Sequence, residues 1–235
     1  YDVTLADFRR LSQRQPGLQV EQITVKSAYR GLVSEHVLPP RVAAKLHGID
    51  LGKTWSVIAR GRMSPRPCDV MWRIAHQVLT VRVFLHRFNI VNSPTCVFCG
   101  RQPETLGHLF LHCVIVRPIW KQIKPQLCRL AGGHFDLTEN LIFYFQWPSF
   151  VPEKAKAPLT VTFSELIYSI WLKRAEVVFR DCCVDTRSVA VLFMHRLRTR
   201  IKADFSRLAR QDFVDLWCRA DILAKVVNDN LLIYI

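Results

Sequence analysis

Three cysteines and one histidine lie close together near the middle of the chain, in an order that suits a metal site. Cys96 and Cys99 form a Cys-x-x-Cys turn, and His108 and Cys113 follow shortly after it. Three soft sulfurs and one imidazole nitrogen are typical ligands of tetrahedral Zn²⁺. Because four protein ligands leave no open coordination position, we predict a structural zinc ion and no metal catalysis.

His112 is an alternative ligand, because it lies one helical turn after His108 and both could face one metal. If His112 were the ligand, the neighbouring Cys113 would not bind the metal, so we favour His108 together with Cys113. The competing interpretation is that the thiols are buried without a metal and that His108 is a core residue. The other cysteines are predicted to be small buried hydrophobic residues, namely Cys68, Cys128, Cys182, Cys183 and Cys218.

The cysteine usage also favours a reducing compartment. The chain has 8 cysteines but no secretory-like segment, so we expect a nuclear and/or cytoplasmic protein that is not secreted. The most apolar run, Leu141 to Phe145, is far shorter than the roughly 20 residues that cross a bilayer, so no membrane partner is expected. The chain starts at Tyr1 without an initiator methionine, and we expect it to be part of a longer protein.

The charge balance points to a polyanionic partner. The sequence holds 33 Lys and Arg against 19 Asp and Glu, a formal net charge of +14. Such an excess favours nucleic acid first and an anionic membrane surface second. The alternative is a solvated basic surface with no particular partner.

The basic residues fall in three stretches: a proline-containing loop, the helices before the cysteines, and a long C-terminal helix. On that helix Arg196 and Arg200, one turn apart, are predicted to form a cationic side opposite an apolar stripe. The alternative is a helix face paired to acidic neighbours. Tryptophan and phenylalanine residues are interpreted as core and not as base-stacking platforms. The candidate nucleic-acid-binding residues are Arg66, Arg73, Arg82, Arg87, Arg196, Arg198, Arg200, Lys202, Arg207 and Arg210.

The hydrophobic periodicity predicts a mostly α-helical fold, with the small Cys3His zinc knuckle inserted between helices. Predicted helices include a largely buried one from Val81 to Phe88, a long one stepping from Val189 to Leu208, and a last one from Asp212 to Asn228. No segment reads as a convincing run of alternating strands.

Composition divides the chain into four expected regions. These are a helical connector over residues 1–60, a zinc-binding helical domain over 61–147, a proline-rich linker over 148–160, and a basic C-terminal helical region over 161–235. The linker is inferred from Pro148, Pro152 and Pro158.

The residues around the predicted zinc site resemble those of a known family. The region from about Val20 to Lys124 resembles the zinc-binding region that follows the polymerase in non-LTR (LINE-type) retrotransposon reverse transcriptases. A helix from Trp72 to Leu79 and Tyr29 in the segment before it fit the same pattern. The resemblance is carried by Cys96-x-x-Cys99-Gly100, Glu104-Thr105, His108-Leu109-Phe110, Cys113 and Trp120.

The resemblance implies a non-catalytic C-terminal segment that holds Zn²⁺ and binds template RNA and/or target DNA during target-primed reverse transcription. Its partner would be the upstream polymerase domain of the same polypeptide. The chain has no Tyr/Phe-x-Asp-Asp motif, so we expect no enzyme activity in this segment. We interpret Glu104 as a helix cap, and we expect the knuckle mainly to brace helices whose arginines bind nucleic acid.

Two other classes of function are left open. The first is a structural or protein-interaction module without nucleic-acid binding, from a domesticated or inactive element. The second is an enzyme in its own right, which would need a perturbed acid–base pair or an open metal position.

Overall fold

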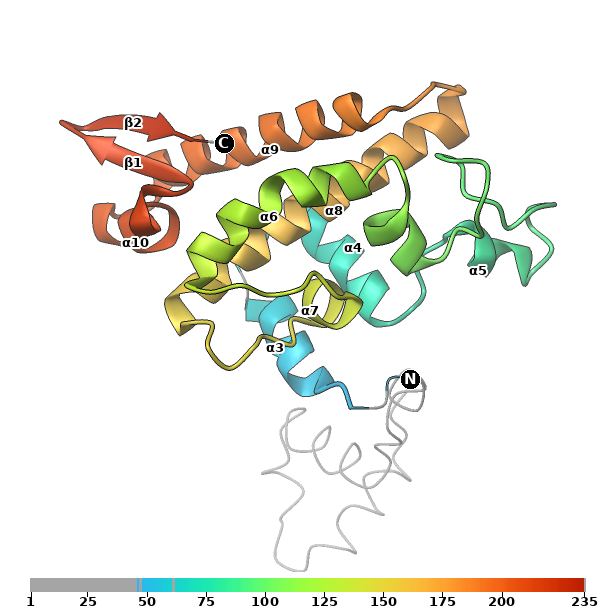
Figure 1. The fold of residues 1–235 in the computed structure, drawn as a ribbon, viewed down its shortest axis with the longest axis horizontal. Coiled ribbons are helices and arrows are strands. Elements are labelled where there is room, and N and C mark those ends of the chain that lie inside the picture. The colour runs from blue at the N-terminus through green and yellow to red at the C-terminus, as the bar shows by residue number, and fades with distance from the viewer. Residues whose placement is uncertain (1–45, 47, 61, 235) are drawn as a thin grey trace, which may run out of the picture. The chain divides into compact units, whose positions relative to one another are not determined.

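The computed structural model of the chain describes residues 46, 48–60 and 62–234 (Figure 1). The chain divides between Gly48 and Ile49, and the second unit, Ile49–Ile235, holds nearly all of the described residues. Most of the connector predicted over residues 1–60, including Tyr29, lies outside the described residues.

The long helix α8, Glu153–Arg180, forms the centre of this unit. Every residue from Pro158 to Ile170 is buried, so the helix is covered on all sides. Figure 1 shows α8 running through the middle of the unit. Its neighbours are α4 (Pro65–Ala75), α6 (Arg117–Ala131), α9 (Thr186–Arg207) and α10 (Arg210–Trp217).

The other elements are shorter, and the sheet within the described residues has two strands, so the predicted mostly helical fold is confirmed. They are α3 (Leu51–Arg60), α5 (Arg82–His86), the π-helical turn η3 (His108–His112), α7 (Glu139–Tyr144), the 3₁₀ turn η4 (Arg219–Asp221), and the strands β1 (Ala224–Val227) and β2 (Asn230–Ile233).

The structure differs from the predicted boundaries around residues 148–160. Only the first part of the predicted linker is irregular, because α8 begins at Glu153 and includes the buried Pro158. A proline inside a helix removes one backbone hydrogen bond, at a cost of about 3 kcal/mol. Here burial of Ala155 and Leu159 against the core outweighs that cost. The regions predicted as 61–147 and 161–235 accordingly pack together in one unit.

The end of the chain corrects a second prediction. The helix predicted from Asp212 to Asn228 ends at Trp217, and β1 and β2 form an antiparallel hairpin instead. Asn228 and Asp229 both have positive φ, at 47° and 62°. Two such residues make the tight turn that suits a two-residue hairpin loop, and Asn and Asp tolerate this backbone conformation well.

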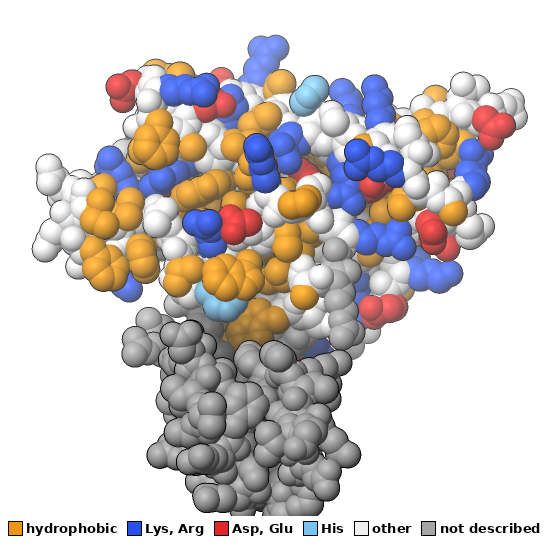
Figure 2. All heavy atoms as spheres, turned by 180° about the vertical axis from the view of Figure 1, so that it is seen from behind, with side chains coloured by type: hydrophobic (Ala, Val, Ile, Leu, Met, Phe, Trp, Pro, Cys, Tyr) orange, Lys and Arg blue, Asp and Glu red, His pale blue; other side chains and the backbone are white. Residues whose placement is uncertain are grey.

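The short helix α5 corrects a third prediction, because none of its residues is buried. The segment after it exposes Phe88 and Ile90 to 62% and 66%. Figure 1 places α5 at the edge of the unit, and Figure 2, seen from behind, shows hydrophobic side chains gathered over this part of the surface.

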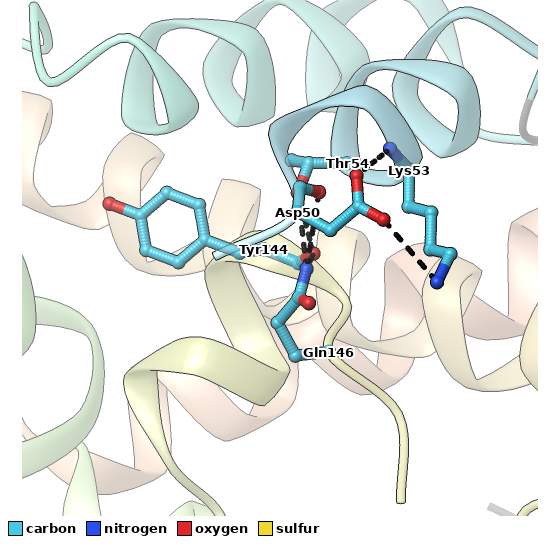
Figure 3. Close-up of polar contacts among 5 residues, drawn as sticks. All are labelled: Asp50, Lys53, Thr54, Tyr144 and Gln146. Carbon is cyan, nitrogen blue, oxygen red and sulfur yellow. Dashed lines mark hydrogen bonds and ion pairs between the residues drawn. The ribbon is translucent and has the colours of Figure 1, made fainter. Parts of the chain in front are cut away.

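Helix α3 is fastened to the end of α7 by polar contacts (Figure 3). The buried Thr54 hydroxyl contacts two backbone oxygens, that of Asp50 at 3.1 Å and that of Tyr144 at 2.8 Å. The Gln146 side chain also donates to the Tyr144 oxygen, at 2.8 Å. Asp50 accepts from the backbone N–H of Lys53 at 3.0 Å and so caps the first turn of α3.

None of the helices among the described residues combines the length and the apolar character needed to cross a bilayer.

Candidate metal centre

The four residues predicted to bind zinc converge in the structure. Their ligand atoms all lie within 4.8 Å of one another, with Cys99 Sγ 3.4 Å from His108 Nε2. Zinc bonds of about 2.0–2.3 Å in a tetrahedron separate the ligand atoms by roughly 3.3–3.8 Å. Cys96 and Cys113 are buried, and the other two are half-buried. The donor set and its spacing therefore fit a closed zinc site.

The first two thiols are held by a tight turn. The N–H of Gly100 donates to the carbonyl of Cys96 at 2.9 Å, and Gly100 has a φ of +62°, which glycine adopts without strain. The N–H of Cys96 donates to the carbonyl of Gln102 at 2.8 Å, and Thr95 pairs with Pro103 in an antiparallel bridge. The loop is therefore a closed hairpin whose turn carries both sulfurs.

The other two ligands come from the π-helical turn η3. The N–H of Cys113 donates to the carbonyl of His108 at 2.7 Å, an i to i+5 bond. This wide turn brings Cys113 back to the side of His108. Leu109 and Phe110 on the turn are fully buried, and Trp120 Nε1–H donates to the Phe110 carbonyl at 2.7 Å. The core thus fixes the position of the turn.

The two candidate histidines lie in different surroundings. His112 is exposed, and its Nε2 lies 3.7 Å from Glu139 Oε1. His108 belongs to the cluster together with Cys113, as predicted.

Neighbouring groups and burial shift the pKa values of three of the cluster residues. A hydrogen bond between Cys96 and Cys113 raises the pKa of Cys96, together with burial, and lowers the pKa of Cys113. Burial lowers the pKa of His108, so its imidazole is neutral at physiological pH, as a metal ligand must be. A bound Zn²⁺ would supply the positive charge that stabilises thiolates at these positions.

Glu104 holds the knuckle in place, a role that the sequence analysis missed when it interpreted this residue as a helix cap. Its carboxylate is completely buried. One oxygen accepts from the backbone N–H of Arg82, at the start of α5, at 2.8 Å. The other accepts from the N–H of Val97, next to Cys96, at 3.2 Å. One carboxylate therefore joins α5 to the zinc loop.

The charge of Glu104 is matched by Arg174 on α8. The guanidinium nitrogens of Arg174 lie 3.0 Å and 3.3 Å from Glu104 Oε1. Arg174 also donates to the carbonyl of Thr80 at 3.2 Å, and its guanidinium lies 4.9 Å from the centre of the Trp171 ring. The buried ion pair ties the knuckle to the central helix.

Two of the predicted nucleic-acid-binding arginines face inward. Arg196 donates to Glu165 at 2.7 Å, and its guanidinium lies 4.5 Å from the centre of the Tyr168 ring. Arg200 donates to Asp204 at 2.9 Å. Glu165 and Asp204 are buried, so these arginines neutralise acidic groups of the core. The cationic side of the helix is therefore not one uniform face.

The other predicted basic residues differ in their surroundings. Arg82 is half-buried, while Arg73 and Arg210 are exposed and pair with Asp69 and Asp229. The remaining members have exposed side chains, namely Arg66, Arg87, Arg198, Lys202 and Arg207.

We predict that Cys99→Ser loses about one zinc ion per chain, because a hydroxyl is a poor zinc ligand. Metal content of the purified protein, measured by elemental mass spectrometry, tests this. Cys128→Ser, which alters a half-buried thiol outside the cluster, and His112→Ala should both keep full zinc. Zinc loss in His112→Ala would contradict the ligand set.

We predict that Glu104→Gln destabilises the zinc-loaded protein by about 3–5 kcal/mol, because it leaves the Arg174 charge buried without a counter-charge. Urea unfolding measures the loss. Glu153→Gln, at an exposed carboxylate, should change the free energy of unfolding by less than about 0.5 kcal/mol. Equal stability of the two variants would refute a structural role for the buried pair.

The metal centre lies within a stretch that is similar to a known family. Residues 24–120, under half of the chain, match the family model described as zinc-binding in reverse transcriptase. No curated protein and no solved structure matches the chain. The matched family is a zinc-binding region and not a catalytic one. The chain thus contains a region similar to the zinc-binding region of reverse transcriptases, and Zn²⁺ is the cofactor that its Cys3His cluster fits.

Proposed function

We propose that the chain is a non-catalytic, zinc-binding C-terminal segment of a non-LTR (LINE-type) retrotransposon reverse transcriptase. It binds template RNA and/or target DNA and supports target-primed reverse transcription. The observation that carries this proposal is the Cys3His cluster inside the residues that match the reverse-transcriptase family.

In this proposal Cys96, Cys99, His108 and Cys113 hold one Zn²⁺, and the metal braces the fold. Two ligands come from the hairpin, one from η3 and one from Cys113 directly after it, so the ion would join the hairpin to this turn. The zinc has no open position for a substrate and takes no part in chemistry.

Nucleic acid would bind to the α4–α9 basic face, which we define as Arg62, Arg66 and Arg207. The guanidinium of Arg200 donates to the carbonyl of Arg62 and to the hydroxyl of Ser64 at 2.7 Å. These bonds place the segment before α4 beside α9. Figure 2 shows Lys and Arg side chains gathered along the upper edge, where Figure 1 places α9.

The basic face suits phosphates and not base sequence. Exposed Arg and Lys side chains release counterions from a nucleic-acid backbone and so give affinity that depends on salt. Arg196 and Arg200 support this face from beneath by neutralising Glu165 and Asp204. The outward and inward arginines of α9 therefore have different roles.

The proposal includes a partner and a compartment. The upstream polymerase domain of the same polypeptide would supply catalysis and share the bound nucleic acid. Thiolate ligands must stay reduced, which favours a nuclear and/or cytoplasmic location.

A second candidate function is a protein-interaction module, possible for a domesticated or inactive element. It is favoured by exposed apolar side chains near the α8–α9 connection, where Phe179 is 80% exposed and Val191 is 60% exposed. This candidate requires no salt-dependent binding of nucleic acid.

We predict that Arg66→Ala with Arg207→Ala weakens binding of single-stranded RNA and DNA of any sequence. Loss of two phosphate contacts should reduce the slope of log affinity against log salt by about 1.4. Fluorescence anisotropy over a salt series measures this. Arg196 and Arg200 are left intact because their removal would leave the buried carboxylates of Glu165 and Asp204 without a counter-charge.

The matched control is Lys121→Ala with Lys154→Ala, which removes the same net charge from exposed positions on α6 and the first turn of α8. If both double variants weaken nucleic-acid binding equally, then only the overall charge matters and the proposed basic face is wrong. Absence of salt-dependent binding by the wild type would favour the protein-interaction module.

A further inference from the structure

The segment that includes α5 carries an exposed aromatic surface beside the knuckle. Phe84 is half-buried, and Phe88 and Ile90 are largely exposed. The rings of Phe84 and Phe88 lie 5.2 Å apart between centroids and are tilted by 55°. The sequence pattern predicts that phenylalanines belong to the core, and the exposed Phe88 differs from that prediction.

The aromatic surface adjoins a hollow of about 230 Å³. Phe84 and Arg87 form one wall, and Leu79, Val81 and Phe143 supply apolar lining. Polar groups also reach the hollow, from Gln77, Thr105, Glu139 and Tyr144. A hollow lined by polar and apolar groups, with an aromatic side chain among them, can offer a planar heteroaromatic ring both hydrogen bonds and a stacking surface.

The charges around this surface are mainly positive. Arg87 and Arg101 are exposed there or on the adjoining hairpin. Of the acidic groups nearby, Glu104 is buried and already accepts from three groups, the backbone N–H groups of Arg82 and Val97 and the Arg174 side chain. Glu139 lines the hollow and lies beside His112. The exposed charges therefore favour an anionic partner over an uncharged one.

The surface is held in a fixed conformation. Glu104 accepts the N–H of Arg82 through its side chain and the N–H of Val83 through its backbone, at 2.8 Å and 3.3 Å. The N–H groups of Phe88 and Ile90 both donate to the carbonyl of Leu85, each at 3.1 Å. Presenting aromatic rings on a rigid turn reduces the entropy that binding must overcome.

We propose, building on the nucleic-acid binding proposed above, that Phe88 and Phe84 stack against unpaired bases of a single strand. Arg87 contacts the phosphate between them, and the adjoining hollow receives one base. Stacking needs an accessible face of the base, which a duplex hides within its own stack. The partner is therefore single-stranded nucleic acid, which the α4–α9 basic face alone does not select.

The test uses the full zinc-loaded chain and a short single-stranded oligonucleotide that carries 2-aminopurine, whose fluorescence is quenched by stacking. Phe88→Ala should weaken single-strand binding roughly 5- to 100-fold and reduce the quenching. Its affinity for duplex and its salt dependence should stay unchanged, because no phosphate contact is lost. Phe88→Trp should keep both affinity and quenching.

Phe179→Ala, which removes an even more exposed phenylalanine from the end of α8, is the matched control and should behave as wild type. One outcome would overturn the stacking proposal and leave the proposed basic face intact. In it, the wild type binds in a salt-dependent way but shows no quenching, and Phe88→Ala has no effect on affinity. That outcome would assign the aromatic surface to a protein contact. Wild type that binds no nucleic acid would overturn both proposals.

Discussion

The buried ion pair between Glu104 and Arg174 is the interaction on which the arrangement of this unit depends. A carboxylate removed from water costs several kcal/mol unless it is paired and hydrogen-bonded, and Glu104 satisfies both conditions. It accepts from the zinc loop, from the start of α5 and from the central helix α8. Three segments far apart in the sequence are therefore held in one geometry by one side chain.

This pair and the metal centre are complementary. Zinc ligation would hold the Cys-x-x-Cys turn to η3, and the Glu104–Arg174 pair holds the same loop to α8. The hydrophobic anchoring of η3 through Phe110 and Trp120 places the ligands at the edge of the core. The knuckle is thus part of the helical unit, and α5 with its exposed aromatic surface is positioned by the same contacts.

The basic residues of α9 have two different surroundings. Arg196 and Arg200 neutralise Glu165 and Asp204 within the core, and Asp204 accepts from the buried Trp217 Nε1–H at 3.0 Å as well. Lys202 and Arg207 on the same helix are exposed. A count of basic residues therefore overstates the surface available to phosphates.

The Cys3His cluster and the mostly helical fold were predictable from the sequence alone, because close cysteine spacing and a helical hydrophobic period are local properties. The sequence could not assign Glu104, because its partner Arg174 lies 70 residues away. Nor could it show that α8 continues through Pro158, or which arginines of α9 turn inward. These three features depend on tertiary contacts. Burial against distant segments sets whether a helix continues through a proline and whether a charged group faces water or a carboxylate.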